Sequence, residues 1–278
     1  MRLSVGGETV AENKINAITS DWQKYELSLV SSKTDFENTA LQVLIDNGSV
    51  ALDMISLFPE ETFKGRENGM RKDLGEKLEA LNPSFLRFPG GCVIEGWDKE
   101  SMYDWKASLG VDKATDTPLE FDGKFGDIAA RSYGTNLWTN LSLTEDTLPC
   151  YMSYGLGFFE YFQLAEDLGA IGVPVINCGI YCQMRGKGGV DMNSGEFRQY
   201  VQDMHDLVEF CRGDENTTWG KVRIDLGREE PFKLKYICIG NENWGQGYFE
   251  RYSYFLNSFN EAKAKNPELY EGIELIYS

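Results

Sequence analysis

Four helix-like patterns, each followed by a short apolar run, fill the chain from residue 59 to its end. The helical patterns have apolar residues three and four positions apart, and the runs have the length of strands. The expected helix–strand pairs are 68–81 with 85–88, 157–168 with 173–178, 196–212 with 234–239, and 248–265 with 273–277. Such an alternation predicts an α/β fold, in which helices cover a parallel sheet.

Residues 1–58 have a different pattern, in which apolar and polar residues alternate as they do on a half-buried strand. The expected strands are 25–29, 41–45 and 50–54, with Asn47-Gly48 as a hairpin turn between the last two. Three or four antiparallel strands are too few to close a sandwich. The sequence therefore predicts two domains, a partial β-sandwich over 1–58 and an α/β domain over 59–278. Within the second domain, 98–150 is expected to be a long loop over the site.

The stretch 236–245 contains the strongest candidate for a catalytic group. Residues 236–239 form an uninterrupted apolar run, as in a strand buried on both faces, and Gly240 ends it. Asn241 and Glu242 then follow at the carboxyl end of the strand, where α/β barrels place their chemistry. A carboxyl group in low-dielectric surroundings keeps its proton near neutral pH, as a general acid must. The alternative is a helix-capping Asn beside a solvated Glu.

Arg87 interrupts an otherwise apolar strand and stands just before the turn Pro89-Gly90-Gly91. Its guanidinium is therefore expected to leave at the end of that strand, and a buried arginine needs an anionic partner. Two interpretations stay open. Arg87 either forms a structural ion pair or keeps a catalytic carboxylate ionised.

The residues around Glu242 suit a sugar ligand. The Asn241 amide offers a donor and an acceptor for a ring hydroxyl, while the neighbouring acid can protonate a glycosidic oxygen. Trp244 can stack on a sugar face, although a tryptophan that caps the rim of a barrel would have the same position. Trp97, Trp105 and Tyr181 have the same two interpretations.

Composition excludes several other classes of protein. The formal net charge of −17 over 278 residues argues against a nucleic-acid partner, which requires clustered Lys and Arg. No apolar run is long enough to cross a membrane, and the N-terminal residues lack the apolar core of a signal peptide. The only histidine, His205, lies in a helical pattern, so a catalytic triad has little support.

The cysteines do not predict a metal site. They lack a CxxC pair and a histidine-rich partner set, and they are interpreted mostly as buried free thiols. The six are Cys92, Cys150, Cys178, Cys182, Cys211 and Cys238. No metal and no organic cofactor is expected.

Three motifs in one order carry a resemblance to a known family. They are Phe-Leu-Arg-Phe-Pro-Gly-Gly-Cys at 85–92, Asn-Thr-Thr-Trp-Gly-Lys at 216–221 and Ile-Gly-Asn-Glu at 239–242. Together they resemble the α-L-arabinofuranosidases of glycoside hydrolase family 51, from about residue 20 to the end of the chain. Ser-Leu-Phe-Pro at 56–59, with the segment 68–74, is similar to the subgroup that carries an inserted carbohydrate-binding-type sandwich.

The resemblance implies a (β/α)8 TIM barrel and a retaining mechanism with two glutamates. Glu242 matches the general acid/base after the fourth strand, Asn241 its sugar-binding neighbour, and Arg87 the arginine that ends the second strand. The chain would then hold strands two to five of a partial barrel, after the last strands of the sandwich. Cys92 stands where part of the family has a substrate-contacting Asn. The family nucleophile belongs after the seventh strand, whereas this chain ends at the fifth.

The function implied is removal of terminal α-L-arabinofuranosyl residues from arabinose-containing polysaccharides, which makes such a glycan the expected partner. Two carboxylates suffice for this chemistry, so the resemblance implies no cofactor either. The chain alone is expected to be inactive, because it lacks the second glutamate. The alternatives are another barrel glycosidase of the same clan and a carbohydrate-binding fragment without catalysis.

Overall fold

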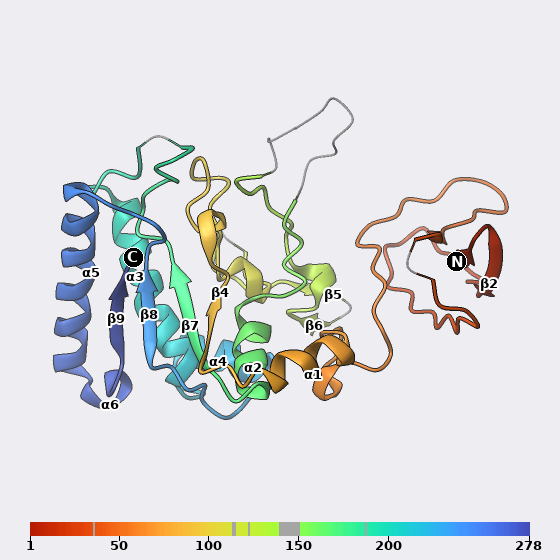
Figure 1. Cartoon of the computed structure of the whole chain (residues 1–278). Coiled ribbons are helices and arrows are strands. Elements are labelled where there is room, and N and C mark those ends of the chain that lie inside the picture. The colour runs from red at the N-terminus through yellow and green to blue at the C-terminus, as the bar shows by residue number, and fades with distance from the viewer. Residues whose placement is uncertain (36, 113–114, 122, 139–150, 187) are drawn as a thin grey trace. The chain divides into compact units, whose positions relative to one another are not determined.

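A computed structural model describes residues 1–35, 37–112, 115–121, 123–138, 151–186 and 188–278. The chain divides into two compact units, Met1–Leu57 and Phe58–Ser278 (Figure 1). None of the described helices has the length and the apolar composition needed to span a membrane.

The first unit contains one antiparallel sheet. Its strands are β1 (Arg2–Val5), β2 (Glu8–Glu12) and β3 (Thr39–Gln42), in the order β2-β1-β3. Gly6 and Gly7 join β1 to β2, both at positive φ (58° and 82°), a conformation that glycine adopts without a steric penalty. Two such residues make the tight turn that matches the twist of a hairpin.

The sequence prediction for this unit is largely wrong. Residues 25–29 and 50–54 are not strands, and Asn47-Gly48 does not join two strands. Strand β3 only overlaps the start of the predicted strand 41–45. Alternation predicts a strand where a neighbouring layer covers the apolar face, but Ile45 and Leu52 are each 51% exposed. The β1–β2 hairpin was not predicted.

The second unit is built on a four-stranded parallel sheet. Its strands are β4 (Phe85–Phe88), β7 (Ile171–Ile176), β8 (Tyr236–Ile239) and β9 (Glu274–Tyr277), in the order β4-β7-β8-β9. The four arrows lie side by side in Figure 1 and point the same way, so their carboxyl ends share one edge. The predicted α/β fold with a parallel sheet is confirmed.

Helices connect these strands. The long ones are α1 (Lys72–Ala80), α2 (Phe158–Asp167), α3 (Gly195–Arg212) and α5 (Gln246–Lys265), with the shorter α4 (Thr218–Asp225) and α6 (Pro267–Tyr270). Helix α1 begins four residues later than predicted, because Asn68 has a φ of 51° that a helix cannot contain. Helix α4 was not predicted. Its N-cap is Thr217, whose side chain accepts a hydrogen bond from the Gly220 N–H.

The main core lies between the sheet and the helices. Strand residues such as Ile176, Ile237 and Ile239 pack there against helical side chains, including Phe162 and Phe255. The other face of the sheet has a smaller cluster. This inner face is hollow, with a volume of about 360 Å³. The hollow is lined by Ser84, Phe85, Arg87, Ile171, Val173, Tyr236, Cys238 and Ile276.

The segment after β4 differs from the loop that was predicted. Among its described residues are five short elements, η2 (Gly91–Val93), η3 (Ala107–Leu109), β5 (Glu120–Phe121), β6 (Lys124–Phe125) and η4 (Ile128–Ala130). A further short helix, η1 (Phe63–Gly65), precedes α1. Trp105 is buried and packs against Phe158, Phe210 and Trp219. Much of 98–138 is therefore core rather than a loop over the site, because side chains such as Trp105, Leu109 and Leu137 are buried, although Tyr133 and Trp138 are exposed. Residues 139–150 lie outside the described residues.

The single histidine gives a prediction about stability. His205 is half-buried in α3, with Nδ1 2.8 Å from the Tyr270 hydroxyl and Nε2 2.9 Å from the Ser258 hydroxyl. Burial lowers its pKa below the ordinary 6.5, and the charge of Asp206 opposes this only in part. The fold thus favours neutral His205. This contribution to stability is present above pH 6.5 and is lost as the pH falls through the lowered pKa.

We expect the NMR signals of the His205 ring to titrate below pH 6.5. We also expect the free energy of unfolding to decrease from pH 7 to pH 5 by a larger amount in the wild type than in His205→Gln. A His205 ring that titrates at or above 6.5 would contradict the prediction.

Candidate active site

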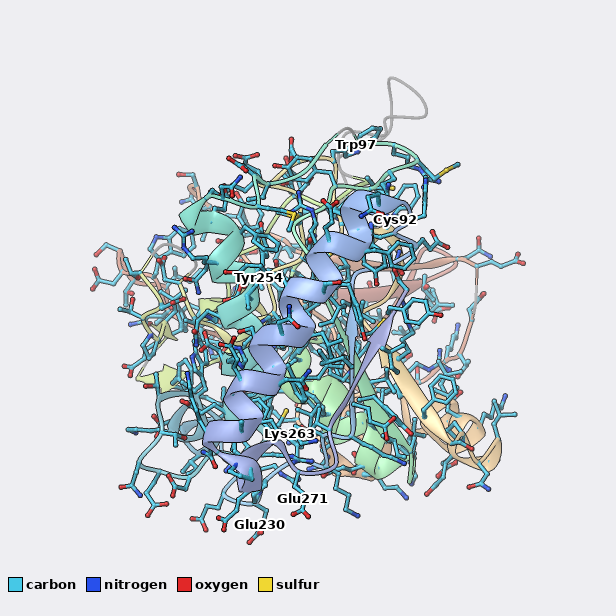
Figure 2. All side chains as sticks on the ribbon, turned by 90° about the vertical axis from the view of Figure 1, so that its left-hand side faces the viewer. Cys92, Trp97, Glu230, Tyr254, Lys263 and Glu271 are labelled. Atoms are coloured by element: carbon cyan, nitrogen blue, oxygen red, sulfur yellow. The ribbon has the colours of Figure 1, made fainter. Side chains whose placement is uncertain are left out.

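The carboxyl ends of β4 and β8 bring together the residues predicted for the site. Arg87 is on β4, and Asn241 and Glu242 follow β8. In Figure 2, Cys92 and Trp97 lie toward one end of the second unit, and Glu230, Lys263 and Glu271 lie toward the opposite end. Arg87 Nη2 donates a hydrogen bond of 2.8 Å to Asn241 Oδ1, so segments 154 residues apart meet here.

Arg87 is exposed, and the expectation of a buried arginine is wrong. Among the described residues it forms no ion pair, and it donates its hydrogen bond to the neutral amide of Asn241. The reason is its direction. Arg87 lines the inner hollow of the sheet, where water reaches the guanidinium and an anionic partner is not required.

Asn241 is buried, and both ends of its amide are engaged. Its oxygen accepts from Arg87, and its Nδ2 donates to Glu95 Oε2 over 3.3 Å. Its backbone N–H donates to Asn243 Oδ1 over 3.0 Å. The preceding Gly240 has a φ of 82°, and a Cβ there would lie 2.3 Å from Asn243 Oδ1. Only glycine therefore allows this turn to close.

Glu242 is exposed, although the sequence suggested low-dielectric surroundings for it. Its neighbours Asn241 and Asn243 both point inward and are buried, which turns the side chain between them outward. Its backbone has a φ of 48°, a region that few non-glycine residues occupy. Its carboxylate Oε2 lies 3.8 Å from Cys92 Sγ.

Glu95 and Asn243 are central to the site and were not among the predicted site residues. Glu95 is 2% exposed, and its two oxygens accept hydrogen bonds from Asn241 Nδ2 and, over 2.8 Å, from Asn243 Nδ2. Burial raises the pKa of this carboxyl group, and the two amide donors act against the shift. Glu95 thus positions both asparagines that flank Glu242. The feature of the sequence that could have indicated Glu95 is its position three residues after Cys92, in the turn that follows β4.

Trp244 is 50% exposed at the rim. Its backbone is held by Gln183, whose Oε1 accepts from the Trp244 N–H over 2.8 Å and whose Nε2 donates to the Trp244 carbonyl over 3.1 Å. The indole ring is thus presented on a fixed loop. Of the other aromatic candidates, Trp97 and Tyr181 are half-buried, and Trp105 belongs to the core.

Two cysteines meet beside Glu95. Ligand atoms of Cys92, Glu95 and Cys182 all lie within 4.8 Å of one another. Both thiols are free, Cys182 is buried and Cys92 is half-buried. Burial, followed by a hydrogen bond with Cys182, raises the pKa of the Cys92 thiol to about 12. Local spacing could not reveal this cluster, because Cys92 and Cys182 are far apart in the sequence.

Comparison with known proteins identifies the family. The profile of the "Alpha-L-arabinofuranosidase 1 domain" matches residues 77–278. An extracellular exo-α-L-arabinofuranosidase of Streptomyces chartreusis is 33% identical over 89% of this chain and 28% of its own length. For α-L-arabinofuranosidase 1 of Arabidopsis thaliana the identity is 36%, over 93% of this chain and 34% of its own length. The chain thus spans about a third of the length of these relatives.

A solved structure shows the same fold. An arabinose-bound MgGH51 α-L-arabinofuranosidase superposes with a TM-score of 0.58 at 28% identity, over 78% of this chain and 29% of that one. The profile match covers more than half of the chain, and it includes Arg87, Glu95 and Glu242. The chain belongs to the α-L-arabinofuranosidase 1 domain family.

Proposed function

We propose that this chain is the acid/base half of a retaining α-L-arabinofuranosidase, with Glu242 as the general acid/base. The observation that carries the proposal is the position of Glu242. It follows a strand of a parallel sheet at the carboxyl edge, in a chain whose family profile covers that strand. Because the Glu242 side chain is exposed at this edge of the sheet, a bound glycoside can reach its carboxyl group.

In this mechanism, protonated Glu242 donates its proton to the glycosidic oxygen as the bond to the arabinosyl carbon breaks. A second carboxylate attacks that carbon and forms a glycosyl-enzyme. Glu242, now ionised, takes a proton from water, which attacks the same carbon and releases the sugar. The nucleophile is not assigned to any residue of this chain. The second carboxylate must lie about 5–5.5 Å from Glu242.

The neighbouring residues have supporting roles in the proposal. Arg87 and Glu95 orient the Asn241 amide from opposite sides, and each uses one of its hydrogen-bonding positions. The second N–H and the second lone pair of the amide are left for a sugar hydroxyl. Asn243 also donates a hydrogen bond to Glu95, and its side-chain oxygen accepts from the Asn241 N–H. These two bonds fix the turn that carries Glu242. Trp244 offers its exposed ring to the sugar or to the aglycone.

The proposal includes a more specific architecture. Strands two to five of a (β/α)8 barrel correspond to β4, β7, β8 and β9. The inner hollow is then part of the barrel interior, which the remaining strands would enclose. Residues 1–58 correspond to the end of an inserted carbohydrate-binding-type sandwich, and 59–278 to the partial catalytic barrel.

A second function has one observation in its favour. Among the described residues the other carboxylate at this site is Glu95, which is buried and already bonded to two amides. Asn241 and Trp244 are recognition groups that need no nucleophile. Binding of an arabinose-containing glycan without hydrolysis is therefore the alternative for this chain by itself.

A substrate comparison tests the proposed function. The parent protein is here the proposed full-length enzyme that contains this chain together with the remaining barrel strands. We expect it to hydrolyse p-nitrophenyl α-L-arabinofuranoside and to release arabinose from arabinan or arabinoxylan. The matched control is p-nitrophenyl α-L-arabinopyranoside, which differs in ring size. Faster hydrolysis of the pyranoside, or of a β-D-xyloside, would assign the site to another class of barrel glycosidase.

A further inference from the structure

We propose that Cys92, Glu95 and Cys182 form a binding site for a thiophilic divalent metal ion, with Zn²⁺ as the physiological candidate, and that the bound ion blocks Glu242. The binding part stands on the geometry of this chain alone. The blocking part rests on the function proposed above.

The three ligand atoms are close to the arrangement that the ion requires. They lie within 4.8 Å of one another. Zinc binds thiolates at about 2.3 Å and carboxylates at about 2.0–2.2 Å, which sets ligand atoms of a tetrahedral site roughly 3.5–3.8 Å apart. A shift of about 1 Å, within reach of side-chain rotation, closes the present cluster around an ion.

The backbone holds the three residues in place before any ion binds. Cys92 and Glu95 share one turn, in which the N–H groups of Glu95 and Gly96 both donate to the Cys92 carbonyl, over 3.2 and 3.0 Å. The Cys182 N–H donates to the Gly96 carbonyl over 3.0 Å, which ties the loop after β7 to this turn. A site with so little freedom loses little entropy when it binds.

The surrounding groups are those that a metal site needs. The amides of Asn241 and Asn243 hold the Glu95 carboxylate, as outer-shell donors do for metal-binding carboxylates. Two thiolates and one carboxylate leave one negative charge on a bound dication. Arg185 Nη1 lies 3.5 Å from Cys92 Sγ and compensates this charge.

The donor set selects the class of ion. Thiolate ligands favour Zn²⁺ and its heavier analogue Cd²⁺, whereas Mg²⁺ and Ca²⁺ prefer sites made only of oxygen. Three protein ligands leave the fourth position of a tetrahedral ion open. Because Glu242 Oε2 is 3.8 Å from Cys92 Sγ, this carboxylate can take the open position. A coordinated Glu242 is unable to carry the proton that glycoside hydrolysis needs.

The first experiment measures binding to this chain without any assay of activity. The reduced, metal-free chain, with its free thiols counted beforehand, is titrated with CdCl₂ and then with ZnCl₂. The readouts are the ultraviolet Cd²⁺–thiolate charge-transfer band and calorimetry. We expect one ion per chain. The affinity should fall by at least about 100-fold in Cys182→Ser and in Glu95→Gln, because the loss of an outer-shell partner alone costs about 10–100-fold.

Cys211→Ala is the matched control, since Cys211 is a buried thiol in α3 outside the cluster. It should bind one ion with the affinity of the wild type, and circular dichroism should show the same fold in all variants. The proposal is overturned if the charge-transfer band is absent, or if Cys182→Ser and Glu95→Gln, both folded, bind as tightly as the wild type.

The second experiment uses the parent protein and its hydrolysis of an aryl arabinofuranoside. We expect Zn²⁺ to inhibit, EDTA to restore the rate, and Cys182→Ser to be active but at least 100-fold less sensitive to Zn²⁺. Zinc binding with full activity would overturn the blocking role. A parent that lacks arabinofuranosidase activity but binds one ion would refute the proposed function and leave the binding site intact.

Discussion

Replacing Glu242 with glutamine in the parent protein should lower the rate of hydrolysis of unactivated arabinosides by about 10²–10⁴-fold, the usual contribution of a general acid. Glutamine keeps the size of the side chain but has no proton to donate to the leaving group. Because Glu242 is exposed, the substitution removes no core packing, and the fold should be retained. Initial rates with arabino-oligosaccharides measure the effect.

The leaving group distinguishes a lost acid from a damaged site. Aryl arabinosides with acidic phenols need little protonation, so their first step should be largely spared in Glu242→Gln. Glu250→Gln is the matched control, since Glu250 is an exposed glutamate of α5 and should behave as wild type. Wild-type rates on unactivated arabinosides in Glu242→Gln would remove Glu242 from the mechanism.

The chain of 278 residues should show no turnover of p-nitrophenyl α-L-arabinofuranoside when it is assayed by itself. A retaining site needs a second carboxylate with a free oxygen about 5–5.5 Å from the first. Among the described residues, Glu95 is the carboxylate next to the turn that carries Glu242. Both of its oxygens accept hydrogen bonds from amides, so neither is free to attack a sugar. The inner face of the sheet is also open, which leaves the substrate without an opposite wall.

The parent protein at the same molar concentration is the positive control for this assay. Binding of arabino-oligosaccharides, measured by calorimetry, separates an inactive site from an unfolded one. Turnover by the isolated chain close to that of the parent would show that the nucleophile lies within these residues, and Glu95→Gln would then be the first variant to examine.

The parallel sheet was predictable because each of its strands is largely apolar and follows a helical pattern. That pattern is local, and burial on both faces enforces it in β7 and β8. The strands of the first unit were not predictable in this way. Alternation near Leu52 has the pattern of a strand, yet its side chain is exposed and lacks the covering layer that would stabilise one.

Only those residues of the candidate site that lie together in one short stretch of sequence could be predicted. Asn241 and Glu242 follow a recognisable strand, so their place at its carboxyl end came from the sequence. Glu95 and Cys182 act through contacts with residues far along the chain, and no local pattern records such contacts. The direction of Arg87 was missed for a related reason. An apolar strand predicts burial on both faces, whereas the hollow beside β4 exposes this side chain.

The backbone of Glu242, at a φ of 48°, has a consequence for any survey of variants at this position. L-residues in this region are disfavoured by roughly 1–2 kcal/mol, whereas glycine and, in part, asparagine occupy it readily. In a saturation library, Gly and Asn should therefore give well-expressed but inactive proteins, and Val and Ile should be depleted already at the level of soluble protein. Sorting such a library by abundance before activity would separate what the turn tolerates from what the reaction requires.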